Sequence, residues 1–220
     1  MISKNNLDFI VKCVENEIID CLIECKFDPT IKEPGHSYGE KVEEILTEKL
    51  ANKYPEKFAH PIKSKSKGKQ TRKMEDLIWI PSNNLINIKL GYKKGNGQPN
   101  MVSFNRLCKN YCENLIDSYW ILLIDVNGDK KENLTTKVYI FNLLDYLDYV
   151  VYNYGTGQVM LNEKKFFNDF DSNKYFNKTK NGIVLKLKNL DHNAFYSHIK
   201  LKEKQHKQKQ ETFDAYLKVS

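Results

Sequence analysis

The sequence lacks the features that would place it among membrane or secreted proteins. No apolar run approaches the roughly 18 residues of a membrane-spanning helix, and the mean hydropathy of −0.61 agrees. Charged residues interrupt the apolar positions of the N-terminus, so we do not expect it to be a signal peptide. The five cysteines are odd in number and irregularly spaced, which favours reduced thiols. We therefore expect a cytoplasmic protein.

Motifs of several common enzyme classes are also missing. The glycine-rich segment 91–100 contains no Gly-Lys-Ser/Thr that would open a helix as in a phosphate-binding loop. The five histidines do not show the HExxH spacing of a zinc protease. The chain also has no internal repeat.

The composition that is present suits one globular domain with a basic surface. The chain has 220 residues, of which 40% are hydrophobic, and this is enough to bury a core. It carries 35 Lys and Arg against 28 Asp and Glu, a net charge of +7 that is compatible with a polyanionic partner. We expect one domain over residues 1–220. An N-terminal helix within residues 1–30 is a candidate dimer contact, with core packing as the alternative, and residues 190–220 form a basic C-terminal helix.

The spacing of apolar residues predicts the secondary structure. Helices are expected over residues 7–27, 37–54, 103–116, 143–149 and 192–217. Strands are expected over residues 76–80, 85–90, 119–126, 136–141 and 182–187. The run 119–126 is apolar apart from Asp125, which is typical of a central strand buried on both faces. This order predicts an α/β or α+β fold with a central mixed sheet.

The sharpest functional signal lies in the hairpin of strands 76–80 and 85–90. Asp76 begins the first strand, and Lys89 lies near the end of the second. Alternation along a strand places Asn87 and Lys89 on one face and Ile88 on the other. A carboxylate binds Mg²⁺, a hard cation that takes oxygen ligands, and an ammonium beside it stabilises an attacking water or a phosphate. The pair therefore suits hydrolysis of a phosphodiester by in-line attack.

Asp76, followed after ten residues by Asn87-Ile88-Lys89, resembles the catalytic motif of the PD-(D/E)xK nucleases. Two flanking pieces resemble the EcoRV/HincII group of type II restriction endonucleases within that superfamily. Residues 34–40, PGHSYGE, are similar to a Gly-His-x-x-Gly-Glu segment, and Gln98-Pro99-Asn100 is similar to a loop that follows the catalytic Lys. The pieces keep the order of that group and cover residues 34–115. The resemblance implies a restriction-endonuclease-like fold, with helices flanking a central mixed β-sheet.

The resemblance also implies a role for each matching residue at the centre of the site. Asp76 matches the metal-binding Asp of the family, and Lys89 matches the catalytic Lys. Glu40 matches a helix Glu that supports the metal or the attacking water. The main-chain carbonyl of Ile88 would be a further metal ligand. The cofactor implied is Mg²⁺.

Contacts with DNA follow from the same resemblance. Gln98 and Asn100 lie in the loop that in this group approaches the bases, and the amide of an Asn can pair bidentately with adenine. Ser103 and either Lys93 or Lys94 would contact phosphate.

Asn87 departs from the family, which has Asp or Glu at this position. Its amide offers one neutral oxygen to a metal but no charge, so metal affinity is expected to be lower than with two carboxylates. Three interpretations stay open. The Asn is a natural variant, or it is an engineered change that traps a DNA complex, or the acidic function has moved to another residue. For that last interpretation, Glu40 is a better candidate than Glu75.

The resemblance as a whole implies a Mg²⁺-dependent type II restriction endonuclease of the bacterial cytoplasm. It would cut both strands of a short palindromic site in double-stranded DNA and leave blunt ends with 5′-phosphates. A homodimer is expected because two identical subunits match a two-fold site. The alternatives are another nuclease of this fold, for repair or junction resolution, and a sequence-specific DNA-binding protein without catalysis.

Two other features have competing interpretations. Cys21 with Cys25 and Cys108 with Cys112 are spaced four residues apart on helix faces, which favours small core residues over a zinc site. Residues 198–211 form a basic stretch of the C-terminal helix. This stretch is either a solvated surface helix or an arm that contacts the DNA backbone.

Overall fold

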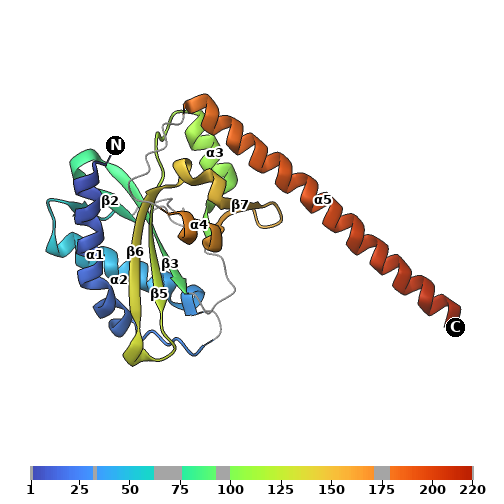
Figure 1. Ribbon diagram of the computed structural model, residues 1–220, viewed down its shortest axis with the longest axis horizontal. Helices are drawn as coiled ribbons and strands as arrows, with labels where there is room; N and C mark the ends of the chain where they lie inside the picture. The colour runs from blue at the N-terminus through green and yellow to red at the C-terminus, as the bar shows by residue number, and fades with distance from the viewer. Residues whose placement is uncertain (1, 32–33, 62–75, 93–99, 171–178, 220) are drawn as a thin grey trace, which may run out of the picture.

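The computed structural model describes residues 2–31, 34–61, 76–92, 100–170 and 179–219. These residues form a mixed α/β structure with a five-stranded sheet, in the order β1-β2-β3-β5-β6, and a three-stranded sheet, in the order β4-β8-β7. The predicted α/β class with a mixed sheet is therefore confirmed. Figure 1 shows helices on both sides of the larger sheet and one long helix that leaves the body of the molecule.

The larger sheet is built around two parallel strands. Its members are β1 (Phe58–Ala59), β2 (Leu77–Trp79), β3 (Asn84–Tyr92), β5 (Trp120–Asn127) and β6 (Thr135–Asn142). β3 pairs with β5 in parallel, and the neighbouring pairs are antiparallel. β5 is buried from Trp120 to Val126, as its continuous apolar run predicts. The hairpin of β2 and β3 encloses a short 3-10 turn, Ile80–Ser82, which ends at Asn83 in the left-handed conformation.

α1 (Lys4–Glu24) and α2 (Pro34–Lys53) cover one face of this sheet. α2 begins at Pro34, because proline suits the first turn of a helix, where its missing N–H costs nothing. Ion pairs join the two helices, Lys49 to Glu24 at 3.1 Å and Lys53 to Glu17. The buried positions of the two helices repeat at helical spacing and pack on the sheet as the first core: Ile10, Val14, Ile18, Leu22, Val42, Leu46 and Leu50.

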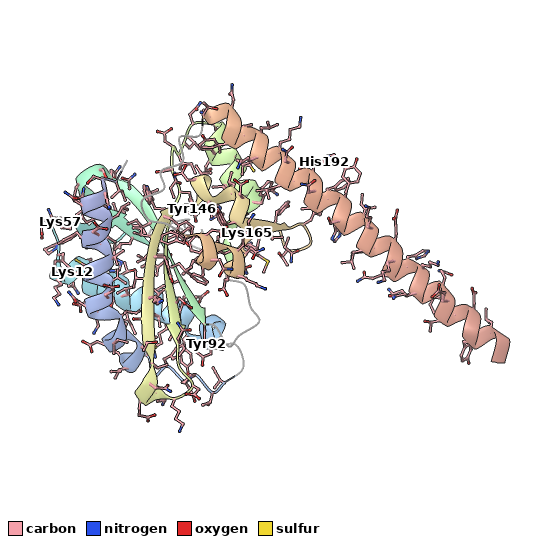
Figure 2. All side chains as sticks on the ribbon, in the orientation of Figure 1. Lys12, Lys57, Tyr92, Tyr146, Lys165 and His192 are labelled. Atoms are coloured by element: carbon pink, nitrogen blue, oxygen red, sulfur yellow. The ribbon has the colours of Figure 1, made fainter. Side chains whose placement is uncertain are left out.

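The apolar face of α1 is thus used in core packing, which was the alternative to a dimer contact. Cys21 and Cys25 are buried in this core, as their spacing predicts. Tyr92 holds the end of β3 in place (Figure 2), because its hydroxyl lies 2.6 Å from the carbonyl oxygen of Gly128 and 3.2 Å from that of Pro29. A homodimer stays a prediction.

The opposite face is covered by short elements. They are β4 (Asn100–Ser103), α3 (Phe104–Cys112), a 3-10 segment (Leu143–Tyr149), β7 (Val150–Asn153), β8 (Gln158–Leu161), α4 (Glu163–Asp169) and the first turns of α5 (Lys180–Val219). A cluster of aromatic rings surrounds Phe166 in this second core. Phe166 lies 4.6 Å from Phe141, 5.0 Å from Phe170 and 5.5 Å from Tyr146, measured between ring centroids. Another short 3-10 turn, Lys131–Asn133, lies between β5 and β6.

Two predictions on this side are wrong. Residues 182–187 are not a strand but belong to α5, because Ile183 and Leu187 lie one helical turn apart and are both buried. Val184 and Leu185 continue the apolar run that begins at Ile183, and this run imitates a short buried strand. Cys112 is exposed rather than a core residue, whereas its partner Cys108 is half-buried against the second core.

No helix in the described ranges is both long enough and apolar enough to cross a lipid bilayer.

Candidate active site

Asp76 is fixed by the strand pairing at the start of the hairpin. Its backbone N–H donates to the carbonyl of Ile86 at 3.0 Å, which extends the pairing of β2 with β3 by one residue. Its carboxylate Oδ2 accepts the backbone N–H of Ile88 at 2.8 Å. The side chain therefore takes the place of a backbone acceptor and cannot rotate away without leaving that N–H unpaired. This arrangement holds the carboxylate beside the carboxyl-terminal part of β3.

Lys89 brings a positive charge to this carboxylate from the neighbouring strand. Its Nζ lies 3.9 Å from Oδ2 of Asp76 and 2.6 Å from the carbonyl oxygen of Ile88. The side chains of Lys89 and Asp76 are 18% and 27% exposed, so the pair is largely shielded but still reachable from solvent. The structure thus brings together Asp76, Lys89 and the Ile88 carbonyl, which the sequence grouped in one hairpin.

The helix carboxylate that reaches this pair is Glu43 rather than Glu40. Oε1 of Glu43 lies 3.3 Å from Nζ of Lys89, and its side chain is 17% exposed. Glu40 lies one turn earlier on α2 and is exposed. The burial of neighbouring positions explains the difference. Glu43 follows Val42, a fully buried residue of the first core, so it lies at the border of the packed face of the helix.

The sequence contained a signal for Glu43. Val42, Leu46 and Leu50 mark the buried stripe of α2, and Glu43 lies at the edge of that stripe, whereas Glu40 lies farther around the helix from it. The resemblance favours the Glu of the Gly-Glu pair in residues 34–40, whereas the helical stripe favours Glu43.

Burial makes both carboxylates harder to ionise. Desolvation raises the pKa of Glu43 to about 7, opposed by the charge of Lys89 and reinforced by the charge of Asp76. Desolvation also raises the pKa of Asp76, while the charge of Lys89 and the Ile88 N–H lower it. When both acids are ionised, the cluster holds two negative charges against one ammonium. A further cation would relieve this excess.

The oxygen atoms of the cluster fit a divalent metal ion. The described residues contain no group of three or more His, Cys, Asp and Glu side chains placed to hold a metal. The donors here are instead two carboxylates, of Asp76 and Glu43, and the carbonyl oxygen of Ile88. This donor set suits Mg²⁺, which prefers oxygen ligands and keeps several of its waters in proteins.

Asn87 lies on the same face of β3 as Lys89, as alternation predicts. It is 7% exposed and pairs in register with Ile121, a residue of the second core, whereas Ile88 belongs to the first core. The position that carries an acid in the resembling family is therefore a buried amide in this chain.

The residues expected to contact DNA are placed only in part. Asn100 is exposed at the start of β4, and Ser103, half-buried at its end, precedes α3. Both belong to the strand that pairs with β8, with Ser103 opposite Gln158. Lys93, Lys94 and Gln98 lie outside the described residues.

A comparison with known protein families finds no family that matches the chain, and a search of curated proteins finds no match either.

Proposed function

We propose that this protein is a Mg²⁺-dependent endonuclease of the PD-(D/E)xK type that hydrolyses phosphodiester bonds in double-stranded DNA. The observation that carries the proposal is the cluster of Asp76, Lys89 and Glu43. One lysine lies within 4 Å of two shielded carboxylates that come from separate elements of the chain. A purely structural ion pair needs only one acid, and a buried acid with a raised pKa beside a lysine is typical of a catalytic centre.

Each residue of the cluster has a distinct task in this proposal. Asp76, Glu43 and the Ile88 carbonyl would hold Mg²⁺, whose charge would stabilise the negative charge that develops on the phosphate. Nζ of Lys89 donates hydrogen bonds to the attacking water or to a phosphate oxygen. With the metal bound, the carboxylate of Glu43 would be ionised, because the neighbouring cation opposes the desolvation that raises its pKa in the metal-free protein. Asp76 stays fixed by the Ile88 N–H, so the acceptor and donor groups keep their positions during the reaction.

We further propose that the substrate is a short palindromic site and that the protein acts as a homodimer. Two copies of one subunit place one site against each strand, which matches the two-fold symmetry of a palindrome. Attack by water on phosphorus leaves a 5′-phosphate and a 3′-hydroxyl. Blunt ends are the outcome that the resemblance to the EcoRV/HincII group implies.

Asn87 supports a second candidate function, a sequence-specific DNA-binding protein that does not cut. The buried amide reduces the charge available to hold a metal at the position next to Ile88. Replacement of Asn87 by Asp tests this candidate. A large gain of Mg²⁺-dependent cleavage in Asn87→Asp would indicate that the amide disables the site.

Digestion of bacteriophage DNA in Mg²⁺ separates the candidates in one experiment. Discrete fragments with 5′-phosphates support a restriction endonuclease, and a smear supports a non-specific or repair nuclease. Intact DNA together with a gel shift supports the binding protein. Cleavage that survives in both Asp76→Ala and Lys89→Ala would show that the catalytic centre lies elsewhere.

A further inference from the structure

The positive charge of the chain is concentrated in its last helix. α5 carries nine Lys against four Asp and Glu, so it accounts for five of the seven net positive charges of the protein. Five of these lysines lie within ten residues, at positions 200, 202, 204, 207 and 209, with a single acid, Glu203, among them. The remaining 180 residues are therefore close to neutral, and α5 dominates the electrostatic character of the molecule.

The part of α5 that holds these lysines has no support from the body. Its first half is packed on the second core by Ile183 and Leu187, and the ring of Phe195 lies 5.4 Å from that of Tyr154. From Lys200 to Leu217, every side chain that the structure describes is exposed. Figures 1 and 2 show the C-terminal part of the helix continuing alone into solvent. We call residues 200–219 the arm.

The arm does not have the composition of a coiled coil. Residues 202–212 contain no apolar side chain, so two arms could not form the continuous apolar seam that such an assembly needs. Lys200, Lys204 and Lys207 follow each other at spacings of four and three residues, which places them on one face, where they repel. Lys207 lies 4.0 Å from Glu211, but this pair is exposed and contributes little.

We propose that the arm binds the phosphate backbone of double-stranded DNA without reading its sequence. Like charges on one face of an isolated helix repel each other in water. Next to DNA they become favourable, because lysines that bind the phosphates release the counterions condensed on the DNA. Twenty residues of helix extend about 30 Å, close to one turn of the duplex at about 34 Å. The identity of the polyanion as duplex DNA rests on the proposed function.

Three exposed apolar residues at the tip of the arm favour the competing interpretation, in which the arm contacts protein instead of DNA. Phe213, Tyr216 and Leu217 are 59%, 75% and 71% exposed and lie on one side of the helix. They would serve a contact with a second copy of the chain. The test below therefore measures the oligomeric state together with DNA binding.

The test compares two variants with the same change of net charge. The arm variant replaces the five lysines 200, 202, 204, 207 and 209 with Gln, which keeps the helix propensity close to that of Lys. The control variant replaces five exposed lysines of the body with Gln: Lys12, Lys109, Lys131, Lys137 and Lys164. Affinity is measured for a random-sequence duplex of about 40 base pairs, which is longer than the arm by more than one turn of the duplex. EDTA is present so that no cleavage occurs.

The arm variant is expected to bind at least about 30-fold more weakly at moderate salt, with the slope of log K against log salt reduced by about 3, since each lost phosphate contact reduces the slope by about 1. The control variant is expected to change affinity far less. Truncation after Ile199 is a second variant and is expected to reproduce the loss, with helical content measured by circular dichroism to show that the body is folded.

Equal affinities and salt slopes for the arm and control variants would overturn the inference. A change from dimer to monomer in sedimentation, with an unchanged salt slope, would also overturn it and assign the arm to a subunit contact. Neither readout depends on catalysis. If the protein binds DNA through the arm but does not cut it in Mg²⁺, the proposed nuclease function is refuted and the role of the arm is supported. If the protein cuts DNA but its affinity does not depend on the arm, the role of the arm is refuted and the nuclease function is supported.

Discussion

The two faces of the five-stranded sheet are packed by different kinds of structure. α1 and α2 cover one face with aliphatic and cysteine side chains at helical spacing. Short strands, a 3-10 segment and short helices cover the other face with clustered rings around Phe166. The candidate active site draws on both sides. Lys89 alternates with Ile88 and so points away from the face that α2 covers, yet Glu43 of α2 approaches it to 3.3 Å.

This contrast shows where a sequence pattern suffices and where it does not. A long amphipathic helix repeats the same spacing of apolar residues over several turns, and each turn supports the same assignment. The second face is held by contacts between residues far apart in the chain, such as Phe141 with Phe166. Such contacts leave no local period in the sequence. The two faces should therefore also differ in their response to conservative substitution.

The largest loss of stability is expected from Phe166→Leu, on the second face of the sheet. Phe166 is fully buried and contacts several rings, each worth roughly 0.5–1.5 kcal/mol beyond the area it buries. We expect the free energy of unfolding to fall by about 2–3 kcal/mol, since the smaller side chain also leaves a cavity. Leu46→Met on the aliphatic face is the matched control and is expected to cost less than about 1.5 kcal/mol. Urea unfolding of both variants measures the difference, and equal losses would refute it.

A second effect is expected where the two faces meet, at Glu43. Burial raises the pKa of Glu43 from 4.5 to about 7, so the folded state binds more protons than the unfolded state between these values. The free energy of unfolding therefore falls as pH rises from 4.5 to 7 and is level above that range. The contribution is on the order of 3 kcal/mol at about 1.4 kcal/mol per pH unit.

Glu43→Gln removes this titration, so its stability relative to the natural protein is expected to rise as pH increases from 4.5 to 7. Glu48→Gln removes the same charge from an exposed position of the same helix and serves as the control. Unfolding curves for the three proteins at pH 4, 6 and 8 measure the trend. A constant difference between Glu43→Gln and the natural protein at all three values would show that Glu43 is not desolvated in this cluster.

The smallest effect concerns the thiols, which differ between the two faces in accessibility. Burial raises the pKa of Cys21 to about 12, and Cys13 and Cys25 are buried beside it in the first core. Cys112 is exposed next to the second core. We expect a thiol reagent to modify Cys112 rapidly in the native protein and the three buried cysteines only on unfolding, because the thiolate is the reactive form. Cys112→Ser should remove the rapid phase; its persistence would contradict the packing described.

Much of the frame of the molecule follows from the sequence, and the exceptions have physical causes. α1, α2, α3 and β5 lie close to their predicted ranges, because their apolar patterns span eight residues or more, and β6 also lies close to its predicted range. β4, β7 and β8 were not predicted, since four residues are too few to establish a period. Residues 182–187 were mistaken for a strand because Val184 and Leu185 lengthen an apolar run that α5 exposes in part.

The candidate site follows the same rule. Asp76 and Lys89 belong to one hairpin, so twelve residues of sequence were enough to bring them together. Glu43 comes from another element, and its distance to Lys89 depends on how α2 packs against the sheet, which no local pattern specifies. The choice of Glu40 therefore failed at the step that required tertiary packing.

The central claim is that Asp76, Lys89 and Glu43 form a hydrolytic site, and the rate of plasmid cleavage tests it most directly. Conversion of supercoiled plasmid to its linear form in Mg²⁺ would be compared for the natural protein, Lys89→Ala and Lys131→Ala, with folding of each verified by circular dichroism. We predict that Lys131→Ala cuts like the natural protein and that Lys89→Ala is at least about 100-fold slower, because a preorganised donor to developing charge is lost. Equal rates for Lys89→Ala and the natural protein would contradict the account.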